Sequence, residues 1–194
     1  MKLFGSVTSP FVRRVRVVAA ELGEAVHFVD THLPAGEAQL RAFTPIWKIP
    51  AAEIEGETLF DSRVINEALI ARHGWGPLRA PQSRDRNLLT VVDGVLDSAI
   101  NWFYLIRRDK GDPNQPYVIR QVARVDSGLE WLANELVGAS FSPDGGFGLP
   151  EIALASCLEW MDFRQVREVA GHPVFGPFVN AWANRRSMSE SRPG

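Results

Sequence analysis

Hydrophobic residues in the first third of the chain follow two different spacings. Short apolar runs of strand length occur at residues 3–7, 26–29, 51–54 and 58–60. Between the first two runs, apolar residues recur every three or four positions, as on one face of a helix: Phe11, Val15, Val18 and Leu22. This order of strands and helices predicts a small mixed sheet with a parallel pair, an antiparallel hairpin and helices on its faces.

The starts of two expected helices carry recognisable signals. Ser9 precedes Pro10 as an N-cap serine before the first helical stripe. Asp61 and Ser62 stand at the start of a later helix, where a carboxylate and a hydroxyl can accept hydrogen bonds from free backbone N–H groups. A shorter helix is expected over residues 37–43.

Beyond residue 75 the pattern is helical. A stretch with two glycines and two prolines, residues 74–81, is typical of a linker. Four helical segments follow, at residues 85–109, 118–136, 152–163 and 174–182. The segment 152–163 is apolar nearly all round, which favours a central buried helix.

The pattern therefore predicts two domains joined by a linker. We expect an α/β domain over residues 1–75, a linker over residues 76–84 and an all-helical domain over residues 85–194. The last residues, 187–194, are expected to form a loose tail.

Charge and composition exclude several classes of function. The 194 residues include 21 basic and 23 acidic side chains, so the formal net charge is −2. This balance argues against nucleic acid or an anionic membrane as the main partner. No run of about 18 apolar residues is found and the apolar start is too short for a signal peptide, so we expect a cytoplasmic protein without a membrane span.

Thiol chemistry in this protein needs a thiol supplied from outside. Cys157 is the only cysteine, and it lies in the apolar segment 152–163, where a cysteine is usually a small inert hydrophobic group. No metal site is expected, because the four histidines lack metal-ligand spacing: His27, His32, His73 and His172. The glycine-rich segment 142–148 lacks the Lys-Ser/Thr of a phosphate-binding loop, so a surface loop is expected there.

Three arginines occur close together on the first helix. Arg13, Arg14 and Arg16 lie mostly off its apolar stripe, which favours a solvated helix face. An anion site is the alternative, because Arg13 lies close to the first helical turn.

Five segments in order resemble motifs of serine-type glutathione S-transferases, including bacterial members. They cover nearly the whole chain, and their order is specific to the superfamily rather than to one substrate. The segments are Thr8–Arg16 (TSPFVRRVR), Phe43–Pro50 (FTPIWKIP), Phe60–Ile65 (FDSRVI), Phe147–Ala155 (FGLPEIALA) and Leu158–Arg164 (LEWMDFR).

The resemblance implies a thioredoxin-like N-terminal domain followed by an all-helical domain, with glutathione as co-substrate and no permanently bound cofactor. Pro50 would be cis, and the backbone of Ile49 would pair with the glutathione backbone like an added strand. Lys48 would help to hold a carboxylate. Asp61 would meet the ammonium group of the γ-glutamyl end, and Ser62 with the helix N–H groups would meet its carboxylate.

Ser9 is expected to stabilise the glutathione thiolate. A free thiol has a pKa near about 8.5, so little thiolate exists at neutral pH. A hydroxyl hydrogen bond to a charged group contributes about 1.5–3 kcal/mol, and a helix N-terminus about 0.3–1 kcal/mol. Ser9 at a helix start supplies both. We expect it to donate to the sulfur rather than to act as a nucleophile, because no general base is evident beside it.

The resemblance also implies a second substrate and a second chain. A small hydrophobic electrophile would lie between the domains, against a wall of aromatic residues that ordinary helix packing explains equally well: Trp102, Phe103, Tyr104 and Tyr117. The family is usually dimeric, so a homodimer is expected.

Other functions remain open on this fold. A non-catalytic binding or partner protein is the main alternative, favoured by Trp47, which stands where the family often has a small residue. A thiol–disulfide oxidoreductase ranks last, because it needs a cysteine near Ser9. A zeta-type isomerase usually has Ser-Ser-Cys in place of residues 7–9. Gly148 and Glu151 also replace the usual Ser and Asp of a helix cap, although Glu151 can still act as in a capping box.

Overall fold

A computed structural model describes residues 1–193. The chain forms two compact units. The first unit contains Met1–Ala80 together with the residues from Ala183 onward, and the second contains Pro81–Trp182. The sequence pattern predicts a helical domain that extends to residue 194, whereas the residues from Ala183 onward belong to the first unit.

A four-stranded mixed sheet forms the centre of the first unit. Its strands stand in the order β2-β1-β3-β4, and only the β1–β2 pair is parallel. This confirms the predicted parallel pair and hairpin, with β3 as predicted and the ends of the other strands shifted by one or two residues: β1 (Lys2–Gly5), β2 (His27–Asp30), β3 (Ala51–Ile54) and β4 (Glu57–Leu59). β1 ends before Val7 because the chain turns there, and the Ser9 N–H donates to the Ser6 carbonyl at 3.1 Å.

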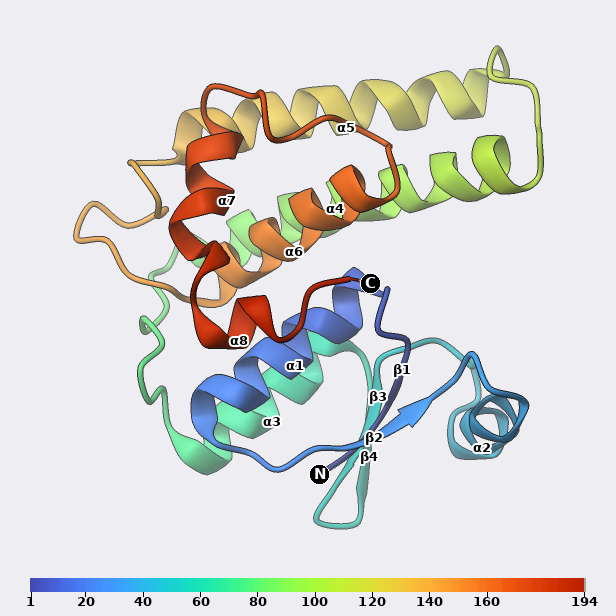
Figure 1. The fold of residues 1–194 in the computed structure, drawn as a ribbon, viewed down its shortest axis with the longest axis vertical. Coiled ribbons are helices and arrows are strands. Elements are labelled where there is room, and N and C mark those ends of the chain that lie inside the picture. The colour runs from blue at the N-terminus through green and yellow to red at the C-terminus, as the bar shows by residue number, and fades with distance from the viewer. Residues whose placement is uncertain (194) are drawn as a thin grey trace. The chain divides into compact units, whose positions relative to one another are not determined.

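Helices cover both faces of this sheet (Figure 1). α1 and α3 lie side by side against one face, and α2 packs on the other around Phe4, Leu40 and Ala51. The three helices are α1 (Pro10–Leu22), α2 (Pro34–Phe43) and α3 (Ser62–His73). The arrangement is the expected thioredoxin-like domain.

The second unit is helical. α4 and α5 pack as an antiparallel pair, and α6 also packs on α4 (Figure 1). Gly128 allows the close approach of α5, because a Cβ at this position would lie 2.3 Å from Cγ2 of Val95. The elements are α4 (Asp85–Trp102), a π-helical continuation η1 (Phe103–Arg108), α5 (Pro116–Glu135), α6 (Leu149–Phe163) and α7 (Phe175–Ala183).

The predicted central helix is confirmed as α6. Almost every residue from Pro150 to Met161 is buried, including Cys157, which is fully buried. The fully buried carboxylate of Glu151 accepts a hydrogen bond from the Gly148 N–H at 2.9 Å, as in a capping box. Its other oxygen accepts from the Ser140 hydroxyl and the Phe141 N–H, each at 2.9 Å. Glu151 therefore ties the preceding loop to the start of α6.

The segment Asp85–Arg108 is long and apolar enough to cross a membrane, by length and composition alone, with a mean hydropathy of 1.3. Core helices of water-soluble proteins meet the same criterion. In this chain α4 buries one face within the second unit, through residues such as Leu88, Val92 and Leu96.

The predicted solvated arginine face and loose tail are both wrong. Arg13 and Arg14 are only 2% and 3% exposed. Residues from Arg185 onward fold back on α1 and include a short helix, α8 (Arg186–Ser189). Arg13 donates to the Ser191 hydroxyl at 3.2 Å and to the Met188 carbonyl at 3.1 Å. The C-terminal residues thus cover the side of α1 that the local pattern leaves polar.

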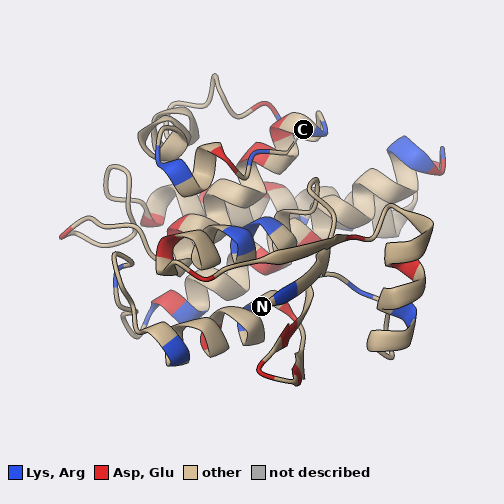
Figure 2. Ribbon diagram, turned by 60° about the horizontal axis from the view of Figure 1, so that its bottom comes forward, with Lys and Arg blue, Asp and Glu red and all other residues tan. Residues whose placement is uncertain are grey.

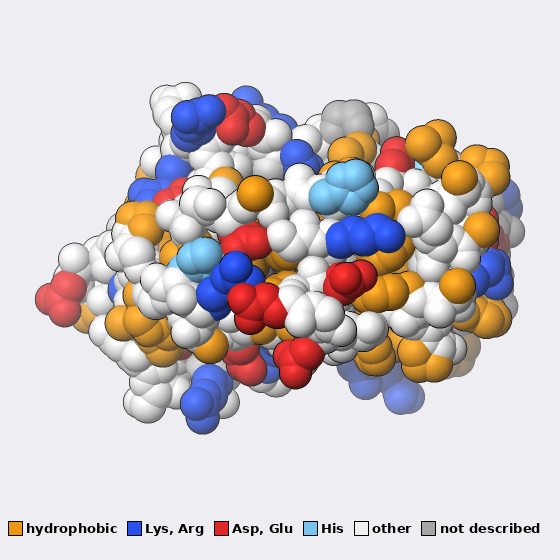
Figure 3. All heavy atoms as spheres, turned by 90° about the horizontal axis from the view of Figure 1, so that it is seen from below, with side chains coloured by type: hydrophobic (Ala, Val, Ile, Leu, Met, Phe, Trp, Pro, Cys, Tyr) orange, Lys and Arg blue, Asp and Glu red, His pale blue; other side chains and the backbone are white. Residues whose placement is uncertain are grey.

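Charged side chains of both signs are interspersed along the chain (Figure 2). The view from below shows hydrophobic side chains at its right, over α2 and the loop after it (Figure 3). The large hydrophobic residues exposed in this part of the chain are Leu33, Ile46 and Trp47.

Candidate functional site

Strand register brings three loops to one edge of the first unit's sheet. Because β3 runs antiparallel to both β1 and β4, the start of β3 lies beside the ends of those two strands. The loop that holds Ser9 follows β1, residues 48–50 precede β3, and Asp61 follows β4. These positions are the ones that the sequence analysis singled out.

Ser9 is the N-cap of α1, as predicted. Its φ and ψ of −81° and 124° are extended, and its hydroxyl oxygen accepts from the Val12 N–H at 3.4 Å. The side chain is half-buried. Among residues 1–193, no acceptor is found for the Ser9 hydroxyl hydrogen. That hydrogen is available to a group placed at the start of α1, where the helix also favours negative charge.

The peptide bond between Ile49 and Pro50 is cis, as expected. Pro50 is buried and Ile49 is half-buried, immediately before β3. In the described part of the chain, neither the N–H nor the C=O of Ile49 takes part in a backbone hydrogen bond. Extended backbone with free donors and acceptors can pair with a peptide ligand as a strand does.

Trp47 precedes this segment in a conformation typical of glycine. Its φ is +54°, in the left-handed region. Its N–H donates to the Thr44 hydroxyl at 3.0 Å, and its indole lies 4.5 Å from the guanidinium carbon of Arg41. Trp47 is 55% exposed and Lys48 is also exposed. Trp47 therefore combines a large exposed side chain with a backbone conformation that glycine adopts most easily.

Asp61 and Ser62 form the start of α3, as predicted. Asp61 is the N-cap, and its carboxylate accepts from the Arg63 N–H at 2.9 Å. Ser62 is buried, whereas Asp61 is exposed. One turn further on, the buried Oδ1 of Asn66 has no hydrogen-bond partner within the described residues. The helix start thus combines an exposed carboxylate with free backbone N–H groups.

The four aromatic candidates of the second unit are only partly brought together. The Phe103 ring lies 5.7 Å from Tyr104 and 5.8 Å from Trp160. Trp102 ends α4 directly before them, while Tyr117 is an exposed residue in the first turn of α5. Sequence reasoning missed Trp160 as a member of this group, although it lies in the quoted segment Leu158–Arg164.

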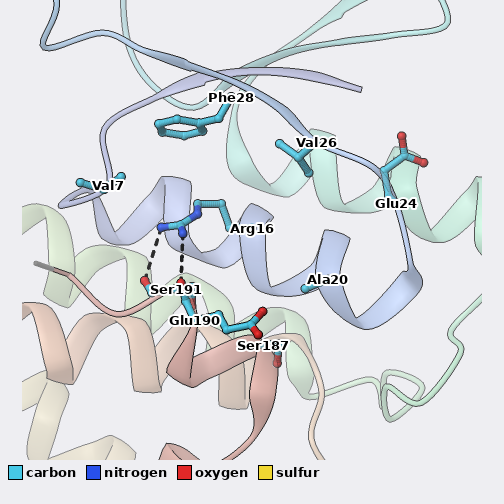
Figure 4. Close-up of a pocket in the computed structure, with 9 residues that line it drawn as sticks. All are labelled: Val7, Arg16, Ala20, Glu24, Val26, Phe28, Ser187, Glu190 and Ser191. Atoms are coloured by element: carbon cyan, nitrogen blue, oxygen red, sulfur yellow. Dashed lines mark hydrogen bonds between the residues drawn. The ribbon is translucent and has the colours of Figure 1, made fainter.

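A hollow of about 380 Å³ lies between α1, β2 and the C-terminal residues (Figure 4). Its charged groups are paired within the chain. Arg16 donates to the carbonyls of Glu190 and Ser191 at 3.3 and 3.5 Å. Glu24 contacts His73 at 2.7 Å, and Glu190 accepts from Arg186 at 2.8 Å. Because these charges already have partners, the hollow is a weaker candidate than the edge with Ser9.

Comparisons with known proteins show which family this chain resembles. A model described as "Glutathione S-transferase, N-terminal domain" matches residues 3–80. The chain is 28% identical to the "Uncharacterized GST-like protein YibF" of Escherichia coli (strain K12), over 100% of this chain and 98% of that protein.

Two crystal structures of glutathione S-transferases are similar to this chain along nearly its whole length. The one from Methylobacillus flagellatus KT, with glutathione bound, has a TM-score of 0.84 at 28% identity and covers 100% of this chain and 99% of its own. The one from Methylobacterium radiotolerans JCM 2831, in complex with glutathione sulfonate, has a TM-score of 0.86 at 25% identity, with coverages of 99% and 94%. The family model over residues 3–80 and the similarity of both units to these two structures support placing the chain in the glutathione S-transferase superfamily.

Proposed function

We propose that this protein is a serine-type glutathione transferase. It binds glutathione as a co-substrate and adds the glutathione sulfur to a small hydrophobic electrophile. The observation that carries this proposal is the Ser9 hydroxyl at the start of α1, whose hydrogen has no acceptor among residues 1–193. Glutathione in the similar crystal structure from Methylobacillus flagellatus supports the choice of thiol.

The cysteinyl part of glutathione would lie along Ile49. The free N–H and C=O of Ile49 offer a donor and an acceptor in the spacing of an added strand. Lys48, directly before it, would meet the carboxylate at the glycyl end. This binding mode orients the ligand without using any group that the chemistry needs.

The γ-glutamyl end would lie at the start of α3. Its ammonium group would pair with the exposed Asp61 carboxylate, and its carboxylate would accept hydrogen bonds from Ser62 and the first N–H groups of the helix. Ligand binding at both ends would hold the thiol beside Ser9.

Ser9 would then act on the sulfur alone. A hydroxyl hydrogen bond to a thiolate and the positive end of α1 both favour the charged form. Together they correspond to a pKa lowered by about 1–3 units, at about 1.36 kcal/mol per unit. The thiol proton passes to water, the thiolate forms the new C–S bond, and the leaving group departs with its electron pair.

Residues of the second unit would contact the electrophile. Phe103, Tyr104, Trp102 and Tyr117 are the proposed wall, with the first two already in ring contact. We also propose a cytoplasmic homodimer, which a sedimentation measurement would test.

Calorimetric titration with glutathione, followed by turnover of 1-chloro-2,4-dinitrobenzene, tests the proposal. We expect binding and turnover, and Ser9→Ala should lower kcat about 10- to 100-fold while changing glutathione affinity less. Thr8→Val is a matched control at the neighbouring hydroxyl. Unchanged turnover in Ser9→Ala would exclude the role of Ser9.

A non-catalytic glutathione-binding protein is the alternative, and Trp47 is the observation that favours it. Its exposed indole stands beside Lys48 in a position that suits glycine. Binding of glutathione without turnover of any electrophile in a panel would support this alternative.

A further inference from the structure

Three arginines of the second unit lack the partners that other arginines of this chain have. Within residues 1–193, Arg107, Arg108 and Arg164 form no ion pair with a carboxylate. Elsewhere in the chain, arginines do form such pairs: Arg41–Glu37, Arg72–Glu55, Arg84–Glu135, Arg167–Asp126, Arg185–Glu21 and Arg186–Glu190. Arg86, Arg120 and Arg124 also lack such a pair within residues 1–193, and what distinguishes Arg108 and Arg164 among these arginines is the aromatic ring that each guanidinium contacts.

These arginines lie together at the junction of η1 and the end of α6. Arg107 on η1 donates to the side-chain oxygen of Gln165 at 3.3 Å, directly after Arg164. The guanidinium carbon of Arg108 lies 5.4 Å from the Tyr104 ring centroid. The junction therefore joins two elements that are far apart in sequence.

Arg164 has two aromatic rings close to its guanidinium group. Its guanidinium carbon lies 5.3 Å from the ring centroid of Phe103 and 4.8 Å from that of Phe163. Its Nε is buried and has no hydrogen-bond partner in the described chain. Rings that contact a guanidinium restrict its orientation and leave its edge, which carries the N–H donors, as the binding side.

The rings beside Arg164 also offer an apolar surface. Tyr104 and Phe163 are 46% and 41% exposed. The Phe103 ring lies 5.7 Å from the Tyr104 ring and 5.8 Å from the ring of the buried Trp160. We call Phe103, Tyr104, Trp160, Phe163, Arg108 and Arg164 the arginine–aromatic cluster.

We propose that the arginine–aromatic cluster binds an aromatic carboxylate. The guanidinium fork of Arg164 takes the carboxylate through paired N–H···O hydrogen bonds, and the exposed rings contact the ring of the ligand. Arg108 adds positive charge at the same surface. An aromatic carboxylate matches both the unpaired donors and the exposed rings, whereas a purely apolar ligand leaves the donors without acceptors.

This inference rests on the proposed function for one point, that the bound molecule is the electrophile. It narrows the second substrate from small hydrophobic electrophiles to aromatic ones with an acidic group. Binding at the cluster itself does not depend on turnover, so the two ideas can be tested separately.

The first test measures binding alone. Calorimetry with 4-chloro-3-nitrobenzoate should give a saturable signal with the intact chain, and the neutral 4-chloro-3-nitrobenzamide should bind about tenfold more weakly or worse. Arg164→Met keeps the stem and removes the charge, so it should abolish the preference for the acid. Arg124→Met, an exposed position on α5, is the matched control and should keep it.

The second test uses the same pair as electrophiles. In each reaction the glutathione thiolate displaces chloride, so a C–S bond forms, the C–Cl bond breaks and the proton goes to water. Arg164→Met should lower kcat/KM for the acid about tenfold or more and leave the amide within about twofold. Arg164→Lys keeps the charge but lacks the forked guanidinium, so its kcat/KM for the acid should lie between those of the parent and Arg164→Met.

The outcomes separate the inference from the proposed function. Equal effects of Arg164→Met on acid and amide, in variants that melt like the parent, would mean that Arg164 only packs, and would overturn the inference. If the acid binds preferentially but neither compound is turned over, the transferase proposal is overturned and the inference stands. If neither test shows a preference for the acid over the amide, the cluster is not a carboxylate site.

Discussion

Arg185 donates two hydrogen bonds to the carboxylate of Glu21, at 2.7 and 2.6 Å, although 164 positions separate them in the sequence. The Ser187 hydroxyl donates to the same carboxylate. Glu21 lies near the end of α1, and its side chain is only 7% exposed. The pair therefore fastens the C-terminal residues to the helix that begins at Ser9.

Glu21→Gln should loosen the C-terminal residues and weaken the acid sensitivity of the fold. Burial alone raises the pKa of Glu21, but hydrogen bonds from Arg185 and Ser187 and the charge of Arg185 outweigh it, so the pKa is lowered from the ordinary 4.5. The stabilisation is complete above that value and disappears as the pH falls through the lowered pKa. We expect a loss of about 1.5–3 kcal/mol at pH 7 in urea unfolding, and a loss that shrinks as the pH falls through the lowered pKa of Glu21.

Glu190→Gln is the matched control for that experiment. Its partner Arg186 is 88% exposed, so removal of this pair should leave stability nearly unchanged. Equal losses in the two variants would contradict the assigned role of Glu21.

Glu151→Ala should be severely destabilising. It leaves the buried N–H groups of Gly148 and Phe141 and the Ser140 hydroxyl without their acceptor. At about 1–3 kcal/mol for each unsatisfied group, a loss of at least about 3 kcal/mol is expected in urea unfolding. Glu130→Gln on the exposed face of α5 should cost little by comparison.

Trp47→Gly should be tolerated, while Trp47→Val should not. Glycine adopts a φ near +54° without strain, whereas a β-branched residue does not. The glycine variant loses only the contact with Arg41, about 0.5–1 kcal/mol at an exposed site. Thermal melting gives the stability, and glutathione titration of Trp47→Gly shows whether the indole limits binding. A glycine variant less stable than the valine variant would refute the assigned backbone conformation.

Ser9 should also set the pH dependence of turnover. The thiolate is the reactive form, so at saturating glutathione kcat/KM for the electrophile rises with pH through the pKa of the bound thiol. With Ser9 present, the midpoint should lie below about 8.5, and Ser9→Ala should move it upward by about 1–2 units. Ser9→Thr should restore much of the shift. An unchanged midpoint in Ser9→Ala would show that the hydroxyl does not hold the sulfur.

Local signals in the sequence account for much of the fold. Ser9, Pro10 and the stripe after them define α1, and Asp61 defines the start of α3. The continuous apolar run of α6 predicts its burial together with that of Cys157. Each of these features depends on neighbours within a few residues, so the local pattern contains the necessary information.

Features that depend on distant partners were not predictable in this way. Arg13 looks like a surface residue because its partners Ser191 and Met188 lie 178 and 175 positions away. A different kind of difference concerns α2 and α5, which begin at Pro34 and Pro116, whereas the apolar pattern predicts starts at residues 37 and 118. At the candidate site, the residue types were predicted, but the free backbone of Ile49 and the unpaired charge of Arg164 follow only from three-dimensional packing.

The C-terminal residues that cover α1 impose an order on biosynthesis. A ribosome completes the sheet and helices of the first unit long before it adds Arg185, Met188 and Ser191. Until those residues emerge, the side chains of Arg13 and Glu21 lie on an uncovered side of α1 and lack these partners. The first unit therefore reaches its final form only after the whole of the second unit has been synthesised.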